Sequence, residues 1–246
     1  MYRIGLLAPF RELPGELGDA IATACEGAVH WQVITEAEDS HALPALRRTG
    51  SDAVLRAGVE RMSRWRPDVV VWACTSGSFV DGRKRALEQV ARLEAVAGVP
   101  ATSTSLAFAE ALAALDVPEV AVVAPYPEPA TARFVDYLRE WGVEVAHAVH
   151  MDSPSGAASE QLSRRDFDAA LAAVGEDRPI LIPDTAVWGL ELHRVLASRL
   201  SVPLLVANQV TLWHAFQLAG MSTDVEAFGA LRGCAAPGIT RGSSAN

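Results

Sequence analysis

The 246-residue chain has 30 acidic side chains against 21 Lys and Arg, giving a net charge of −9, and half of its residues are hydrophobic. The acidic balance argues against nucleic acid as a partner, because phosphate backbones are bound by clustered Lys and Arg. With 21% charged residues beside that apolar half, the composition is typical of a folded chain with a sizeable core rather than a disordered one.

The N-terminus leads from Met1 directly into a strand pattern, without the features of a signal peptide. No apolar run approaches the roughly 18 residues of a membrane span, so no membrane partner is expected. The three widely spaced cysteines, at positions 25, 74 and 234, predict neither a disulfide nor a metal site. These features favour a cytoplasmic protein.

Short apolar runs alternate with amphipathic stretches along the chain. In chain order, strands are predicted over 2–8, 29–34, 68–73, 120–124, 143–149, 179–183 and 203–206. Helices are predicted near 15–26, 51–65, 83–97, 104–115, 129–141, 164–175, 187–200 and 208–219. Strands that alternate with helices of about ten to fifteen residues indicate βαβ units and a mainly parallel sheet.

The sequence also repeats itself. The run Ile4-Gly5-Leu6-Leu7-Ala8-Pro9-Phe10 matches Val120-Ala121-Val122-Val123-Ala124-Pro125-Tyr126, an offset of 120 − 4 = 116 residues. An Arg-Pro pair and an apolar run precede both Cys74 and Asp184, at an offset of 184 − 74 = 110 residues. Two matches at nearly one offset predict an internal duplication.

We therefore expect an α/β fold of two similar lobes, each a mainly parallel sheet flanked by helices, related by a pseudo-twofold duplication. The N-terminal lobe is predicted over 1–100, with a boundary near Val99-Pro100, and the second lobe over 101–207. The helix at 208–220 is expected to cross back to the first lobe. A Gly- and Pro-containing tail at 233–246 is expected to be flexible.

Cys74 lies at the end of the apolar run Val69-Val70-Val71-Trp72-Ala73 and begins Cys74-Thr75-Ser76-Gly77-Ser78. Open α/β sheets bind ligands at the carboxyl ends of their strands. Backbone N–H groups and a following helix would lower the pKa of the thiol, and a thiolate acts as a nucleophile or a base. A catalytic Cys74 should then alkylate fast near neutral pH. The alternative is a small buried hydrophobe, as expected for Cys25 and Cys234.

Asp184 holds the position that Cys74 has in the first half, so the duplication places the two on opposite sides of one cleft. Desolvation after an apolar strand would raise the pKa of the carboxyl group and suit it to donate a proton. The alternative is a helix N-cap before Thr185-Ala186-Val187.

Three further side chains lie near predicted strand ends. Tyr126 could donate its hydroxyl group to a substrate carboxylate or lie at a rim as an ordinary aromatic. Arg11 could pair with a carboxylate through its planar guanidinium, or be a solvated surface charge. Asn208 could bind ligand or cap a helix. The six histidines show no metal-binding spacing, and most are expected at the surface or in caps.

Taken together, these motifs resemble the aspartate/glutamate racemase superfamily, and within it the maleate cis-trans isomerases and arylmalonate decarboxylases. The resemblance rests on Arg3-Ile4-Gly5-Leu6-Leu7-Ala8-Pro9, Cys74-Thr75-Ser76-Gly77-Ser78-Phe79, Pro125-Tyr126, Asp184-Thr185 and Ser201-Val202-Pro203 with Asn208-Gln209. It implies two α/β lobes around a cleft and reactions on small carboxylic acids without a cofactor or metal.

By this resemblance, Cys74 corresponds to the first of two family cysteines, which adds to the alkene in maleate isomerases. Thr75, Ser76 and Tyr126 correspond to residues that hold a substrate carboxylate, and Thr185 and Asn208 are expected to bind substrate as well. The chain departs from the pattern twice. Asp184 replaces the second cysteine, and Phe10-Arg11-Glu12 replaces an Asn-containing loop, which makes Arg11 a candidate for the carboxylate.

These observations predict a cofactor-independent isomerase or lyase that acts on a small mono- or dicarboxylic acid, with maleate-type cis-trans isomerisation through Cys74 favoured. Cys74 and Asp184 would be the catalytic pair. The alternatives are a decarboxylase or racemase of the same superfamily, or a carboxylate-binding protein without turnover. The chain could also form a homo-oligomer.

Overall fold

The computed structural model describes residues 2–9, 11–24, 28–35 and 37–238. Cys25, Phe10 and the last part of the predicted tail, 239–246, lie outside the described residues. The strands are β1 Arg3–Pro9, β2 Val29–Thr35, β3 Val69–Trp72, β4 Ala101–Ser103, β5 Glu119–Ala124, β6 Glu144–His150, β7 Ile180–Ile182 and β8 Leu204–Val206. All seven predicted strands are present, and each predicted boundary lies within one residue of the observed one.

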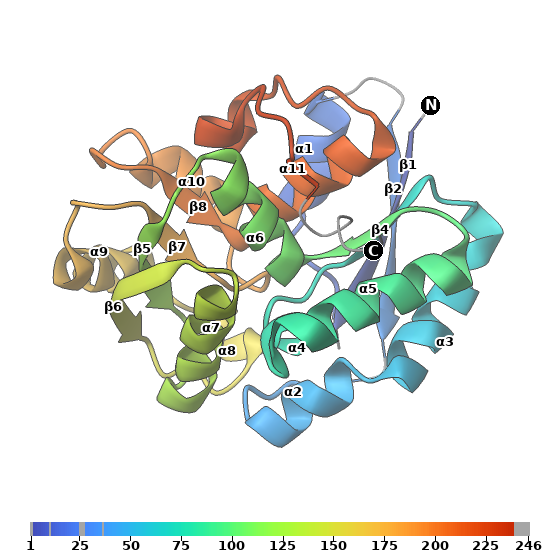
Figure 1. Cartoon of the computed structure of the whole chain (residues 1–246), viewed down its shortest axis with the longest axis horizontal. Helices are drawn as coiled ribbons and strands as arrows, with labels where there is room; N and C mark the ends of the chain where they lie inside the picture. Colours follow the sequence, from blue (N-terminus) through green and yellow to red (C-terminus); the bar gives the residue numbers. More distant parts are fainter. Residues whose placement is uncertain (1, 10, 25–27, 36, 239–246) are drawn as a thin grey trace.

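The helices flank these strands in the order that the sequence predicts (Figure 1). They are α1 Glu16–Ala24, α2 Leu43–Thr49, α3 Asp52–Met62, α4 Ser76–Phe79, α5 Gly82–Ala97, α6 Thr104–Ala114, α7 Glu128–Glu140, α8 Gly156–Glu160, α9 Arg164–Val174, α10 Gly189–Leu196 and α11 Ala207–Ala219, with 3-10 segments η1 Ser63–Trp65 and η2 Glu226–Leu231.

Two four-stranded sheets organise the described residues, with orders β2-β1-β3-β4 and β6-β5-β7-β8. Every pairing is parallel. Adding four to each strand number of the first sheet gives the order of the second, so the two sheets have the same topology. This confirms the predicted fold class of two similar α/β lobes. The lobes lie side by side in Figure 1, the first in blue to green and the second in green to orange.

The centre of each sheet is apolar because its strands are covered by helices on both faces. All four residues of β3 are buried, and β3 pairs with β1 from Ile4 opposite Val69 to Leu7 opposite Trp72. The three residues of β7 are buried in the same way. These central strands are therefore firmly fixed, and each delivers its following loop to the same edge of its sheet.

The structure adds elements that the sequence did not predict, namely β4, α2, α4 and α8. The strand β4 consists of Ala101-Thr102-Ser103 and pairs with β3, so it lacks the apolar run by which the other strands were predicted. The first sheet thus extends three residues beyond the predicted boundary near Val99-Pro100. The last long helix, α11, follows the second sheet but contacts β3 and β4 of the first, and it packs along α6.

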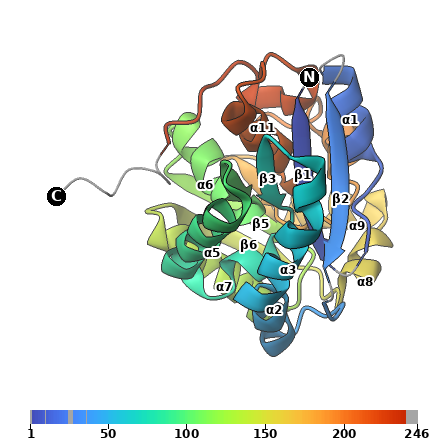
Figure 2. The ribbon, with the colours of Figure 1, turned by 90° about the vertical axis from the view of Figure 1, so that its right-hand side faces the viewer.

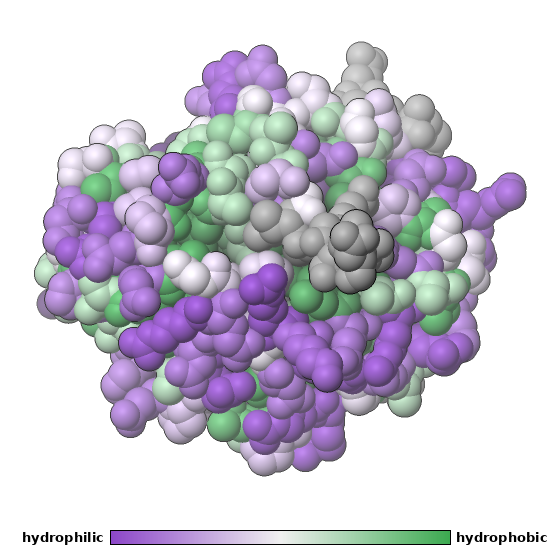
Figure 3. All heavy atoms as spheres, in the orientation of Figure 1, coloured by the Kyte–Doolittle hydropathy of each residue, from purple (hydrophilic) through white to green (hydrophobic). Residues whose placement is uncertain are grey.

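Figure 2 shows β2, β1 and β3 of the first sheet side by side, with α1 and α3 next to them. Hydrophilic side chains cover much of the surface over α5 and α7 (Figure 3), where several Arg side chains pair with acidic neighbours. No helix in the described part of the chain has both the length and the apolar character that a membrane span requires.

Candidate active site

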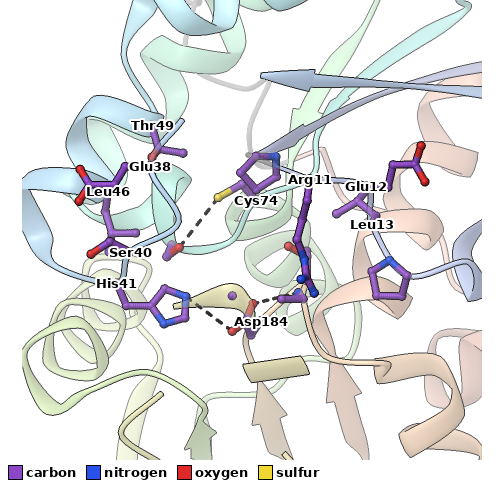
Figure 4. A pocket seen from close by; sticks show the side chains of 16 residues that line it. Arg11, Glu12, Leu13, Glu38, Ser40, His41, Leu46, Thr49, Cys74 and Asp184 are labelled. Atoms are coloured by element: carbon purple, nitrogen blue, oxygen red, sulfur yellow. Dashed lines mark hydrogen bonds and ion pairs between the residues drawn. The ribbon is translucent and has the colours of Figure 1, made fainter. Parts of the chain in front are cut away.

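A narrow cavity, with about 30 Å³ of space for a water-sized molecule, lies where the carboxyl ends of β1, β2, β3 and β7 meet. Both lobes supply its walls: Cys74 comes from the first and Asp184 from the second (Figure 4). The duplication thus correctly predicted that these residues share one cleft. The remaining described lining residues are Pro9, Arg11, Glu12, Leu13, Pro14, Glu38, Ser40, His41, Leu46, Thr49, Ser76, Gly156, Thr185 and Ala186.

Cys74 is held by a tight turn that connects β3 to α4. The Gly77 N–H points at the sulfur, with N to Sγ at 3.3 Å, and the Ser76 hydroxyl oxygen lies 3.9 Å from Sγ. A Cβ at Gly77 would lie 3.1 Å from the Cys74 sulfur and 3.2 Å from the Trp72 ring, so a side chain there would crowd the thiol. The Ser78 hydroxyl group donates to the Cys74 carbonyl oxygen at 2.7 Å and fixes the turn.

The protonation of Cys74 differs from the sequence-based expectation. Burial raises the pKa of the Cys74 thiol to about 12, and the negative charge of Asp184 acts in the same direction. The Gly77 N–H and the Ser76 hydroxyl group oppose this effect but do not overcome it, because the side chain is only 4% exposed. The expected low pKa is therefore wrong for the unliganded protein, in which Cys74 is a protonated thiol.

Asp184 follows β7 and Pro183, and its Oδ1 accepts a hydrogen bond from the Ala186 N–H at 3.0 Å. This bond closes a side-chain turn. It does not cap a helix, since α10 begins only at Gly189. The helix-cap interpretation is therefore wrong. Burial raises the pKa of Asp184, as the sequence predicted. Its Oδ2 has no hydrogen-bond partner among the described residues.

Two hydroxyl groups hold the chain beside Cys74 and Asp184. The Thr185 hydroxyl group donates to the Ala73 carbonyl oxygen at 3.2 Å, so the residue after Asp184 is joined across the lobes to the residue before Cys74. Within the second lobe, the Tyr126 hydroxyl group donates to the Pro183 carbonyl oxygen, next to Asp184. Cys74 is thus positioned in part from the opposite lobe, and Asp184 from its own.

Tyr126 is fully buried and is absent from the described cavity lining, so its rim interpretation is wrong, while its contact with substrate stays a prediction. Burial raises its pKa well above the usual range, and the charges of Asp184 and Cys74 add to this effect. Thr75 is likewise buried outside the lining, and its hydroxyl group has no hydrogen-bond partner in the described part of the chain. Ser76 and Thr185 do line the cavity.

Arg11 reaches the cavity mouth and forms an ion pair there with Glu160 of α8. It therefore bridges the two lobes, which corrects its interpretation as a solvated charge. Asn208 lies in the first turn of α11, and its amide donates to Glu16 Oε1 and to the Val187 carbonyl oxygen, both at 2.9 Å. It neither caps the helix nor lines the described cavity, so the predicted ligand contact is not seen.

Sequence analysis missed His41, which lies in the loop between β2 and α2 and lines the cavity beside Asp184. His41 Nε2 is 3.8 Å from Asp184 Oδ2, and both side chains are buried. The sequence could have indicated His41, because β2 is parallel to β1, so the residues that follow β2 must lie at the same edge of the sheet. In the described ranges, no group of three or more His, Cys, Asp or Glu side chains is placed to hold a metal ion.

Two similar α/β lobes with a cysteine and a carboxyl group facing one cavity between them define the class of protein. A model of the arylmalonate decarboxylase family matches residues 39–232. The chain therefore belongs to the arylmalonate decarboxylase family, as its motifs predicted. A maleate isomerase from Geobacillus stearothermophilus is 23% identical over 187 residues, which cover 72% of this chain and 73% of the relative.

Solved structures confirm the fold. The maleate isomerase from Pseudomonas putida superposes with a TM-score of 0.86 at 20% identity, covering 94% of this chain and 98% of that one. A Nocardia farcinica maleate cis-trans isomerase, a cysteine-to-serine variant with a covalently bound succinylcysteine intermediate, gives 0.81 at 20% identity and covers 94% and 97%. An arylmalonate decarboxylase gives 0.70 at 19% identity and covers 89% and 92%.

Proposed function

We propose that this chain is a cofactor-independent enzyme that isomerises a small carboxylic acid of the maleate type through Cys74. The observation that supports it is the pairing of a cysteine thiol and a carboxyl group across one buried cavity, in a family that includes arylmalonate decarboxylase. Maleate isomerases share the fold, and in one of them a succinyl group is bound to cysteine.

In the proposed reaction, the Cys74 sulfur forms a bond to one alkene carbon while its proton passes to a base on the opposite wall, which we assign to Asp184. The alkene electron pair moves onto the adjacent carboxylate and forms an enediolate, which leaves a single carbon–carbon bond that can rotate. Expulsion of Cys74 re-forms the double bond in the trans geometry, and the proton returns to sulfur. No atom is gained or lost.

Substrate contacts are proposed from the groups that the lining offers. Ser76 and Thr185 can contribute hydroxyl groups to a carboxylate, and Arg11 can contribute its guanidinium at the mouth if it exchanges Glu160 for substrate. We assign a supporting role behind the cavity lining to Thr75, Tyr126 and Asn208. The expected ligand is accordingly a small carboxylate anion.

Decarboxylation is a second candidate, because the high pKa of Cys74 favours a proton donor over a nucleophile. In that reaction a malonate-type substrate loses carbon dioxide, and Cys74 protonates the enediolate that remains. The thiol is then reprotonated from solvent. Both candidates use an enediolate, so the same cavity serves either one.

Proton NMR in D₂O separates the two candidates. We expect maleate to become fumarate without deuterium on carbon, whereas decarboxylation of a substituted malonate would leave one deuterium on the α-carbon. Cys74→Ser should abolish turnover, because an alcohol is a far weaker nucleophile than a thiolate, while Cys234→Ser should remain active as the matched control. Full activity in folded Cys74→Ser would refute the proposal, as would no conversion of either substrate by the wild type.

A further inference from the structure

Asp184 and His41 meet inside the cavity although they come from different lobes. Asp184 Oδ2 lies 3.8 Å from His41 Nε2, and each residue is 6% exposed. The other carboxyl oxygen, Oδ1, is already occupied by the Ala186 N–H. In Figure 4 the imidazole ring points at the carboxyl group along the cavity wall. His41 is the described side chain that forms an ion pair with Oδ2, and the Ser159 hydroxyl group is a second polar neighbour of the carboxyl group.

The second lobe fixes the orientation of the imidazole ring. His41 Nδ1 lies 2.8 Å from the Ser153 carbonyl oxygen, and the His41 backbone N–H donates to the Pro154 carbonyl oxygen at 2.8 Å. The Tyr126 ring meets the imidazole edge-on at 4.8 Å between centroids. Because a carbonyl oxygen only accepts hydrogen bonds, Nδ1 carries a hydrogen and Nε2 is the nitrogen that faces Asp184.

This geometry requires a proton on the pair. If both Nε2 and Oδ2 were unprotonated, two lone pairs would face each other, and the buried carboxylate would be compensated only in part, by the Ala186 N–H and the Ser159 hydroxyl group. One proton removes both costs, either on Nε2 as an imidazolium beside a carboxylate or on Oδ2 as a carboxylic acid beside a neutral ring.

We propose that His41 is a positioning residue that shares one proton with Asp184 and thereby sets the ability of that carboxyl group to exchange a proton opposite Cys74. The proposal rests on the proposed function, in which Asp184 is the proton-transfer group. It also explains in chemical terms how Asp184 can replace the second cysteine of the family pattern. A carboxyl group alone is poorly matched to a thiol, whereas a carboxyl–imidazole pair holds a transferable proton within reach of the same cavity.

Among the charged groups around Asp184, His41 is the one placed to share a proton with it. Arg11 and His41 are the described lining residues that carry or can carry positive charge, and Arg11 is paired with Glu160. The other titratable groups around the pair are Cys74 after β3, Tyr126 after β5, Asp39 in the loop that carries His41, and Glu12 and Glu38 at the lining. Burial raises the pKa of Asp184, and the charge of Asp39 adds to this effect, whereas a positive His41, the Ala186 N–H and the Ser159 hydroxyl group lower it.

The test compares His41→Asn with His150→Asn. An Asn amide can replace Nδ1 as the donor to Ser153, but it places nothing at Nε2. His150 is the matched control because its Nδ1 lies 3.1 Å from Asp152 Oδ1 in an exposed pair on the second lobe. The readout is the ¹³C-carboxyl NMR titration of Asp184, assigned with Asp184→Asn. We expect His41→Asn to move the Asp184 midpoint upward by about one pH unit or more, and His150→Asn to leave it unchanged.

A folded His41→Asn protein with an unmoved Asp184 midpoint would overturn the proposal. If that variant fails to fold, His41→Ala removes the same charge, also places no donor at the Nε2 position, and is expected to give the same upward shift. In turnover assays, kcat should fall about tenfold or more with KM nearly constant, and the pH profile should move in the direction of the NMR midpoint. A shifted midpoint in a protein that converts no acid would refute the proposed function and leave the His41–Asp184 pair intact.

Discussion

The alkylation of Cys74 in the unliganded protein should be slow. The perturbation is iodoacetamide, applied to a protein in which Cys25 and Cys234 are replaced by Ser so that a single thiol reacts. Because the thiolate is the reactive form, the rate depends on the pKa of Cys74, which burial raises from 9.0 to about 12. The sequence-based expectation of fast alkylation near neutral pH is thereby reversed.

The magnitude of this effect follows from the pKa. At pH 8, about one-tenth of an ordinary thiol with a pKa of 9.0 is ionised, against about one in 10⁴ for a pKa near 12, which is a loss of about 10³-fold. A thiolate of higher pKa is intrinsically more nucleophilic, which restores about 16- to 30-fold over this interval. Alkylation should therefore be at least roughly 30-fold slower than for the same chain unfolded in urea. The 4% exposure of Cys74 slows it further.

The assay follows the modified peptide by mass spectrometry from pH 7 to pH 10. A pKa near 12 predicts a rate that rises about tenfold per pH unit throughout, whereas an ordinary thiol levels off near pH 9. Asp184→Asn should accelerate the reaction, because it removes a negative charge that raises the pKa of Cys74. A plateau below pH 9 in the folded protein would refute the reasoning, since it would mean that the turn stabilises the thiolate against burial.

Two further predictions concern stability. Above pH 9 the unfolded chain ionises Cys74 while the folded chain does not, so the unfolded state binds fewer protons and stability falls as the pH rises. Between pH 7 and pH 10, the free energy of unfolding of the wild type, measured in urea, should therefore drop by about 1.4 kcal/mol more than that of Cys74→Ala. If the two proteins lost the same free energy over this range, the assigned pKa of Cys74 would be contradicted. Tyr126→Phe leaves the buried Pro183 carbonyl without its donor and should lower the free energy of unfolding by about 1–3 kcal/mol, whereas equal urea midpoints would exclude this role.

Much of the fold was predictable because buried parallel strands leave a strong local signal. Runs such as Val69-Val70-Val71-Trp72 are continuous in sequence, and their repetition at a nearly constant offset reveals the duplication. Ala101-Thr102-Ser103 carries no such signal. It becomes a strand because β3 offers it a partner, which is a property of the assembled sheet.

The site was predictable where a residue type and a strand end coincide, as for Cys74 and Asp184. The sequence could not predict properties that depend on the surroundings of a side chain in the folded protein. The turn that was expected to stabilise a thiolate does supply an N–H to Cys74, yet desolvation outweighs it. His41 has no unusual neighbours in the sequence, and only its packing against Ser153 and Asp184, far away in the chain, gives it a site.

The duplicated scaffold supports chemistry that differs from one side to the other. The two sheets share one strand order, and Cys74 and Asp184 follow the equivalent central strands β3 and β7. The scaffold is therefore close to symmetric while the groups that it carries are not. A thiol on one wall and a carboxyl–imidazole pair on the other cannot exchange roles as two thiols can. We infer that the site handles the two faces of its substrate unequally, with carbon–sulfur bonding assigned to the first lobe and proton transfer to the second.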